Sequence, residues 1–294
     1  MLMGLGGAVG FLSGLFGVGG GFLLTPMLIF SGIPTPVAVA SVTSQVVAAS
    51  TSGALSYWRR GGIDLKLASF LIVSGIGGAT LGVWTFGILR DAGQLELVIS
   101  FGYLIFLGSI GMLMLVEAVR SIMKHRSGEV IPHKLPGQHN WVHGLPLRVR
   151  FKRSNLYVSI LPVIAIGASI GFLGSLLGIG GGFILVPALI YILRVPGNVV
   201  IGTSLLQVLA IMAATTILHA INSQTVDIML AFSLMVGSVI GAQFGASAGQ
   251  HLRGEQLRAL LALIVLAVAI RFALSLLLTP ADPFSMTVLS GGIS

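Results

Sequence analysis

The sequence contains no cysteine among its 294 residues, which excludes disulfide bonds, thiolate metal sites and catalytic thiols. Charged residues are also scarce, at 8% of the chain, whereas hydrophobic residues make up 55% and the mean hydropathy is +1.03. A soluble domain could not cover its surface with so few charges. The composition therefore predicts an integral membrane protein.

Motifs of catalysis and of ATP use are missing as well. No Gly-x-x-x-x-Gly-Lys loop occurs, and no soluble domain is present to hold one, which excludes an ATP-driven pump. No His-Glu cluster, serine elbow or intramembrane pair of carboxylates occurs. We therefore expect no enzyme, no metal site and no cofactor.

Apolar runs of about 20 residues are abundant, and a helix of that length crosses about 30 Å of hydrocarbon. Such runs predict spanning helices rather than barrel strands, so the predicted fold class is an all-α polytopic membrane protein. Half of the sixteen Lys and Arg residues lie between Arg120 and Arg153. A basic loop beside a membrane span marks the cytoplasmic side. This placement accounts for the excess of positive charge, so we expect the lipid bilayer as the partner and no nucleic acid.

The central motif of the chain occurs twice, because Gly17-Val18-Gly19-Gly20-Gly21-Phe22 returns as Gly178-Ile179-Gly180-Gly181-Gly182-Phe183. Proline follows both copies, at Pro26 and Pro187, and similar helices follow each proline. The duplication predicts two homologous transmembrane repeats. We expect repeat 1 over 1–120, a basic cytoplasmic linker over 121–154, repeat 2 over 155–279 and a C-terminal tail over 280–294.

A triple glycine weakens a helix by about 1 kcal/mol per residue relative to alanine, so these segments need an explanation. One explanation is close helix packing. The other is a helix break near mid-membrane, which frees backbone N–H groups and aims the positive end of the next helix at a bound anion. The repetition favours the second explanation, with Gly20 and Gly181 in equivalent positions. The predicted binding residues here are Gly19, Gly20, Gly21 and Phe22, with Gly180, Gly181, Gly182 and Phe183.

A polar cluster begins the helix after each break. Gln45 and Gln207 occupy equivalent positions, and an amide in hydrocarbon requires partners. Bonding between helices and a shared polar site both remain open as explanations. The predicted binding residues of these clusters are Thr43, Ser44 and Gln45 in the first repeat, and Thr203, Ser204 and Gln207 in the second.

Other polar and small residues have simpler structural interpretations. Asp64 and Asp227 each begin a helix, where a carboxylate acts as an N-cap. Glycines at four-residue spacing in these two helices predict close packing. His219 and Arg271 are the cationic or titratable side chains expected at depth. We expect both to reach towards the headgroups, with a functional role for each as the alternative. The spaced glycines are Gly78 and Gly82, then Gly237, Gly241 and Gly245.

The orientation of the repeats depends on how the glycine segment crosses the membrane. If that segment is a re-entrant hairpin, each repeat has three further spans and the repeats are inverted; if it spans, they are parallel. The inverted arrangement places Arg194, Arg253 and Arg258 inside and only Arg90 outside, as the positive-inside rule prefers. We therefore expect inverted repeats, with a broken but spanning helix as the alternative.

With its paired Gly-x-Gly-Gly-Gly-Phe-x-x-x-Pro segments, four-helix repeats and basic central linker, the chain resembles the sulfite exporter TauE/SafE family over nearly its whole length. The sequences Ser44-Gln45 and Leu206-Gln207 after the breaks strengthen this resemblance. It implies a multi-pass carrier of the bacterial inner membrane. The implied substrates are sulfur-containing oxyanions or organosulfonates, such as sulfite, sulfoacetate or taurine-derived products, and the implied direction is export.

The expected function is a secondary transporter that binds a small anion at mid-membrane between the two breaks and works by alternating access. Modest attraction by two helix termini would let the substrate leave again. An anion channel, and an uptake permease for a different small anion or carboxylate, remain open as alternatives. The coupling ion, whether proton or sodium, and assembly into a homo-oligomer also remain open at this point.

Overall fold

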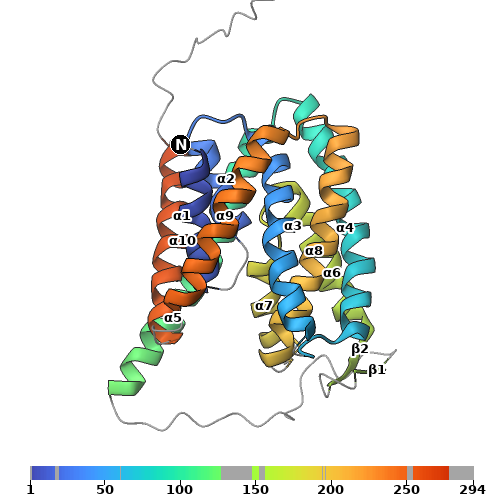
Figure 1. Cartoon of the computed structure of the whole chain (residues 1–294), viewed down its shortest axis with the longest axis vertical. Coiled ribbons are helices and arrows are strands. Elements are labelled where there is room, and N and C mark those ends of the chain that lie inside the picture. The colour runs from blue at the N-terminus through green and yellow to red at the C-terminus, as the bar shows by residue number, and fades with distance from the viewer. Residues whose placement is uncertain are drawn as a thin grey trace, which may run out of the picture.

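The computed structural model describes residues 2–16, 20–59, 61–126, 148–151, 156–193, 195, 197–249 and 254–277. The described elements are almost all helical (Figure 1). In the first half they are α1 (Leu2–Phe16), α2 (Gly21–Phe30), α3 (Thr35–Arg59), α4 (Leu65–Asp91) and α5 (Leu95–Arg126). A short hairpin of β1 (Arg148–Phe151) and β2 (Leu156–Ser159) precedes α6 (Ile160–Leu177), α7 (Gly182–Tyr191), α8 (Gly197–Asn222), α9 (Ile228–Gly249) and α10 (Gly254–Leu277).

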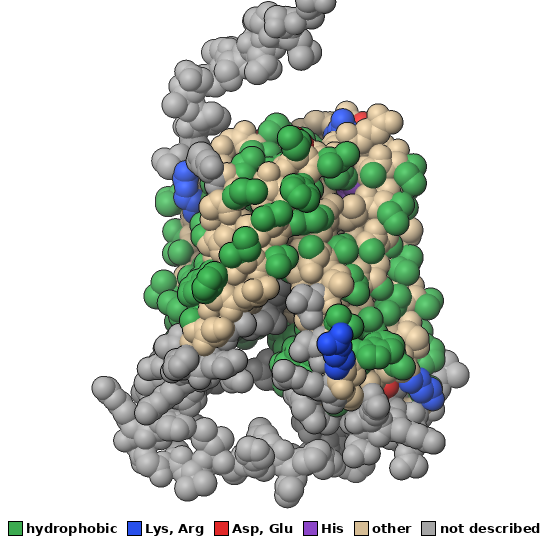
Figure 2. All heavy atoms as spheres, viewed as in Figure 1, with side chains coloured by type: hydrophobic (Ala, Val, Ile, Leu, Met, Phe, Trp, Pro, Cys, Tyr) green, Lys and Arg blue, Asp and Glu red, His purple; other side chains and the backbone are tan. Residues whose placement is uncertain are grey.

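Within the described residues, six helices are long and apolar enough to cross a membrane, which agrees with the predicted polytopic helical protein. In Figure 2 the described Lys and Arg side chains lie towards the upper and lower ends of the face shown, and hydrophobic side chains cover much of the surface between them. Exposed apolar side chains such as Trp84 and Phe244 fit a lipid-facing surface. The six segments are Leu65–Asp91, Leu95–Val116, Ile160–Leu177, Val199–Asn222, Ile228–Gly245 and Ala259–Leu277.

Equivalent helices of the two halves pack against each other and run in opposite directions. Near one end of the α3–α8 pair, the Thr216 hydroxyl donates to Thr43 Oγ1 at 2.8 Å. Near the other end, Leu205 of α8 lies beside Gly53 of α3, so the residue numbers run in opposite senses. The α5–α10 pair behaves in the same way, because the rings of Tyr103 and Phe272 stack with their centroids 5.2 Å apart and Gly111 lies beside Val265.

The remaining long contacts join different helices of the two halves. α1 packs along α9, and α4 packs along α6, and in both pairs the two helices run in the same direction. A Cβ on Gly78 would overlap backbone of Ala168, and one on Gly241 would overlap backbone of Gly7. The predicted use of the spaced glycines for close helix packing is therefore confirmed.

Two further contacts bring the halves together with near-identical geometry. The backbone N–H of Asp64 donates to Thr203 Oγ1 at 3.1 Å, and the backbone N–H of Asp227 donates to Ser41 Oγ at 3.1 Å. The Asp64 carboxylate accepts from the N–H groups of Lys66 and Leu67, while the Asp227 carboxylate accepts from the N–H of Leu230. Both aspartates are helix N-caps, as the sequence predicts.

Parts of the sequence-based expectations lie outside the described residues. They include most of the basic linker (127–147 and 152–154), the whole tail (280–294), and both Arg194 and Arg253. α5 continues to Arg126, beyond the expected end of repeat 1 at residue 120. Gly17, Val18 and Gly19 also lie outside the described part of the chain.

Candidate functional site

The described parts of the two glycine segments meet in the interior of the molecule. Each ends one short helix and begins another: α1 gives way to α2, and α6 gives way to α7. The ring of Phe22, at the start of α2, stacks on the ring of Phe183, at the start of α7, with centroids 4.5 Å apart and planes 8° from parallel. Both rings are buried. The positive ends of two short helices therefore lie close together, as the sequence predicts.

Side chains fill the space between the two breaks. Val46 of α3 packs against both of them, because a Cβ on Gly21 would lie 2.6 Å from Val46 Cγ2 and one on Gly180 would lie 2.8 Å from Val46 Cγ1. The carbonyl of Ile179 is also near Gly21. An anion could enter this space only if the two halves moved relative to each other.

The second break depends on glycine for its backbone conformation. Gly178, Gly180 and Gly181 have φ angles of +70°, +78° and +74°, a region that residues with a Cβ rarely occupy. Gly178 ends α6, and its N–H donates to the carbonyl of Gly174 at 3.0 Å. Gly181 then precedes the first residue of α7.

Gly20 differs from Gly181 in conformation. Its φ of −62° and ψ of −2° lie in the right-handed helical region. A Cβ on Gly20 would lie 3.2 Å from side-chain atoms of Ser13 and Val9, whereas one on Gly181 would lie 2.6 Å from Ile170 Cγ2. The two positions are therefore equivalent in sequence but not in backbone geometry.

The carbonyl groups that the second break frees are bonded to side chains from three other helices. Thr25 Oγ1 of α2 donates to the carbonyl of Gly178 at 3.2 Å, and the Tyr103 hydroxyl of α5 donates to the carbonyl of Leu177 at 2.7 Å. Nε2 of His219, on α8, lies 3.1 Å from the carbonyl of Ser175. These contacts satisfy carbonyls that a continuous helix would have bonded itself.

The two glutamines of the polar clusters are buried without hydrogen-bond partners. Gln45 and Gln207 are both 0% exposed. The oxygen and the nitrogen of each amide lack a partner in the part of the chain that the structure describes. Bonding between helices, one of the two explanations left open by the sequence, is therefore not found. An unpaired buried amide costs about 1–3 kcal/mol, so two of them at equivalent positions call for a bound partner.

The hydroxyl groups of the clusters, in contrast, are engaged in the fold. Thr43 Oγ1 donates to the carbonyl of Ala40 at 2.7 Å and accepts from Thr216. Thr203 accepts from the N–H of Asp64, and Ser204 donates to the carbonyl of Ile201 at 2.9 Å. Ser44 is buried at 7% exposure.

Sequence reasoning missed Thr25 and Tyr103. Each contacts a residue of the other half, and such contacts depend on which helices lie side by side. The one available signal was that Tyr103 is a lone polar aromatic residue within an apolar run, because a buried tyrosine hydroxyl requires a hydrogen-bond partner.

The expectation for His219 is wrong, because its side chain is 0% exposed rather than directed towards the headgroups. Phe86 of α4 covers the imidazole, with ring centroids 4.7 Å apart and planes at 74°, and the carbonyl of Ser175 bonds to it. Arg271 is exposed, and its guanidinium lies 5.3 Å from the centroid of the Phe30 ring.

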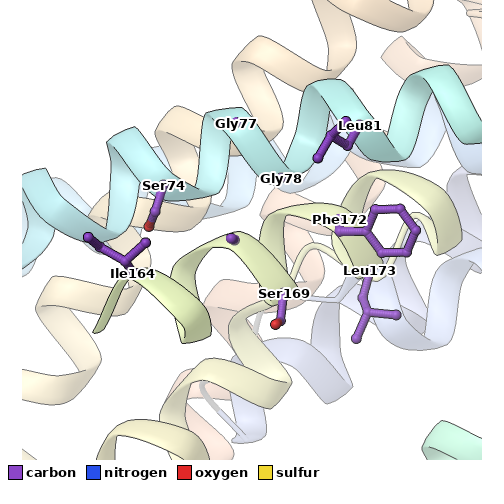
Figure 3. A pocket seen from close by; sticks show the side chains of 9 residues that line it. Ser74, Gly77, Gly78, Leu81, Ile164, Ser169, Phe172 and Leu173 are labelled. Carbon is purple, nitrogen blue, oxygen red and sulfur yellow. The ribbon is translucent and has the colours of Figure 1, made fainter. Parts of the chain in front are cut away.

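Two apolar pockets lie away from the breaks, along the paired helices. One lies between α4 and α6, and Figure 3 shows Gly77 and Gly78 above it with Ser169 and Phe172 on the opposite helix. The other lies between α1 and α9, around Gly7 and Gly241. Neither pocket is lined by a predicted binding residue, and both follow from the shortage of side-chain volume at the glycines.

Comparisons with known proteins identify relatives over nearly the full chain. A protein from Xylella fastidiosa (strain 9a5c), described as a probable membrane transporter protein, is 35% identical over 91% of this chain and 92% of its own. The probable membrane transporter protein YjnA of Bacillus subtilis (strain 168) is 29% identical over 92% of this chain and 97% of its own. No solved structure shows a significant match.

The family model described as sulfite exporter TauE/SafE matches residues 2–272, which include both breaks and all ten helices except the end of α10. The resemblance noted from the glycine motifs is thereby confirmed. The protein is a multi-pass membrane transporter, and the chain belongs to the sulfite exporter TauE/SafE family.

Proposed function

We propose that this protein is a secondary transporter that exports small sulfur-containing anions, such as sulfite or organosulfonates, from bacterial cells. The description of its family suggests the substrate class and the direction. The observation that carries the proposal is the pair of buried glutamines, Gln45 and Gln207, whose amides have no partners among the described residues. Their N–H groups can donate to an anion, as can the first N–H groups of α2 and α7.

This site uses partial charges rather than a buried cation. Each helix N-terminus carries about half a unit of positive charge, and an amide adds a neutral donor. A lysine or arginine at mid-membrane would instead cost about 2.5–3.5 kcal/mol on insertion scales. A site of neutral donors binds an anion modestly, and a carrier requires modest binding so that the substrate can leave.

Alternating access would then be a movement of one half against the other. The stacked rings of Phe22 and Phe183, together with Val46, close the space between the breaks in the described arrangement. The antiparallel packing of α3 on α8 supports two halves that are inverted across the inner membrane. Such halves can exchange conformations and so open the site to either side.

The test is transport by the purified protein in lipid vesicles. Radiolabelled sulfite is offered in parallel with sulfate, thiosulfate, sulfoacetate and taurine. We expect saturable flux for one or more of the sulfur anions, and faster flux when the same anion is present on the other side. Flux that rises linearly with concentration and shows no countertransport would identify an anion channel. Transport of none of these sulfur compounds would reject the proposed substrate class.

A further inference from the structure

A second buried polar group lies beside the break and has no role in the anion site. His219 is in the last turns of α8 and is 0% exposed. Its Nε2 lies 3.1 Å from the carbonyl oxygen of Ser175, and a carbonyl can only accept, so Nε2 carries the hydrogen in the neutral ring. Nδ1 is then a bare lone pair. It is buried and has no hydrogen-bond partner among the described residues.

The imidazole is bonded to the break itself. Ser175 lies in the last turn of α6, three residues before Gly178, where the helix ends. The carbonyls near a helix C-terminus have no partner in their own helix and carry the negative end of its dipole. A change at the His219 ring therefore acts directly on the end of α6, at the start of the segment that leads to α7.

No charged side chain is bonded to the ring, whose described contacts are the Ser175 carbonyl and the edge-on phenyl ring of Phe86. Among the neighbouring helices, α6 has no charged residue. Lys66 of α4 and Arg59 of α3 belong to the opposite end of α8, near Thr203. At the end where His219 lies, Arg90 donates to the carbonyl of Ser223 at 2.7 Å, and Asp227 caps α9.

A proton on Nδ1 would thus create a cation with no carboxylate bonded to it in the described structure. A buried charge without a counter-charge is costly. A transported anion between the breaks supplies the missing negative charge, so the occupancies of the two sites should favour each other. In the state without substrate, the ring should therefore be neutral, with its single N–H donating to the Ser175 carbonyl.

We propose that Nδ1 of His219 is the proton-binding site that couples proton movement to anion transport, an inference that rests on the proposed function as a carrier. The lone pair of Nδ1 takes a proton from water on one side, giving an imidazolium with two N–H donors. The same proton leaves to the other side after the anion, which restores the neutral ring. No other reactant is required, and the coupling ion is a proton rather than sodium.

The first test measures sulfite transport in vesicles with and without a pH gradient. A difference of about one pH unit is worth about 1.4 kcal/mol per coupled proton, which corresponds to a tenfold change in accumulation. We expect the wild-type protein to approach this change and His219→Gln to lose it, while sulfite exchange at equal pH persists. Glutamine can still donate to the Ser175 carbonyl but takes up no proton, so a purely structural role predicts no loss of the pH effect.

A control and a substrate-independent measurement complete the test. Tyr57→Phe, at the equivalent position on α3, should keep the gradient effect. Wild-type transport that ignores the gradient, or His219→Gln transport that follows it, overturns the inference. If sulfite is not transported at all, the proposed function fails, and nitrogen NMR of ¹⁵N-histidine-labelled protein then tests proton binding at Nδ1 separately. The signal absent from His219→Gln should then shift as the ring takes up a proton on acidification, and a ring that stays neutral overturns the proposal.

Discussion

Replacing the buried amides of Gln45 and Gln207 should affect the stability of the fold and the binding of the anion in different ways. Gln45→Met and Gln207→Met keep the length of the side chain but remove its polar atoms. Because the amides have no partners among the residues that the structure describes, the free energy of unfolding should stay the same or rise, by up to about 1–3 kcal/mol. Affinity for the anion should fall at least tenfold, about 1.4 kcal/mol, as measured by binding to purified protein.

Thr215→Val is the matched control for this prediction. Thr215 is also buried on α8, but its hydroxyl donates to the carbonyl of Ile211 at 2.8 Å within its own helix. We expect anion binding to persist in this variant. Methionine variants that unfold more easily and bind normally would show that the glutamines serve packing instead.

The unlike backbones of Gly181 and Gly20 predict unlike effects of an added methyl group. At Gly181 the φ of +74° and the contact with Ile170 oppose alanine, so Gly181→Ala should lower the free energy of unfolding by about 1–3 kcal/mol and weaken anion binding. Gly20→Ala should cost less, because the φ of Gly20 is −62° and the added Cβ would lie no closer than 3.2 Å to its neighbours. Thermal unfolding in detergent compares the two, and equal losses would contradict the assigned backbone conformations.

At the scale of helices, the contact between α4 and α6 can be tested with two adjacent glycines. A Cβ on Gly78 would overlap backbone of Ala168, so Gly78→Ala should force the helices apart and cost about 1–3 kcal/mol. A Cβ on Gly77 meets nothing within 4 Å, so Gly77→Ala should be neutral or stabilising, by up to about 1 kcal/mol. Thermal unfolding of both variants gives the answer, and a loss at Gly77 instead would reject this register of the two helices.

The sequence was sufficient for features that depend on local chemistry. The helices, the caps at Asp64 and Asp227 and the breaks follow from apolar length, carboxylate position and glycine clusters within short segments. The partners of Tyr103 and His219 could not be predicted, because α5 and α8 reach the end of α6 only through tertiary packing. His219 was assigned to the interface from its place near a helix end, whereas α4 and α6 cover it.

For the molecule as a whole, the inverted arrangement that we propose for the repeats predicts opposite accessibility of the linker and the tail. The chain has no cysteine, so single substitutions can be labelled without background. Gln138→Cys and Ser290→Cys lie outside the described residues, while Gln94→Cys lies in the turn between α4 and α5. A membrane-impermeant maleimide should reach Ser290→Cys and Gln94→Cys from the periplasm but Gln138→Cys only from the cytoplasm, because the linker is basic. Labelling of Ser290→Cys from the cytoplasm, together with Gln138→Cys, would instead indicate parallel repeats.

The packing of α1 along α9 affects how this protein is made in the cell. α1 is synthesised long before α9, the helix that packs on its glycine surface, so Gly14 has no contact with Ala242 until α9 has been made. Contacts between residues so distant in sequence form slowly and leave unmatched surfaces exposed in the meantime. The early helices therefore insert into the membrane before they can assemble. A nascent chain interrupted in the linker would contain α1 to α5 but would lack α9, on which α1 packs.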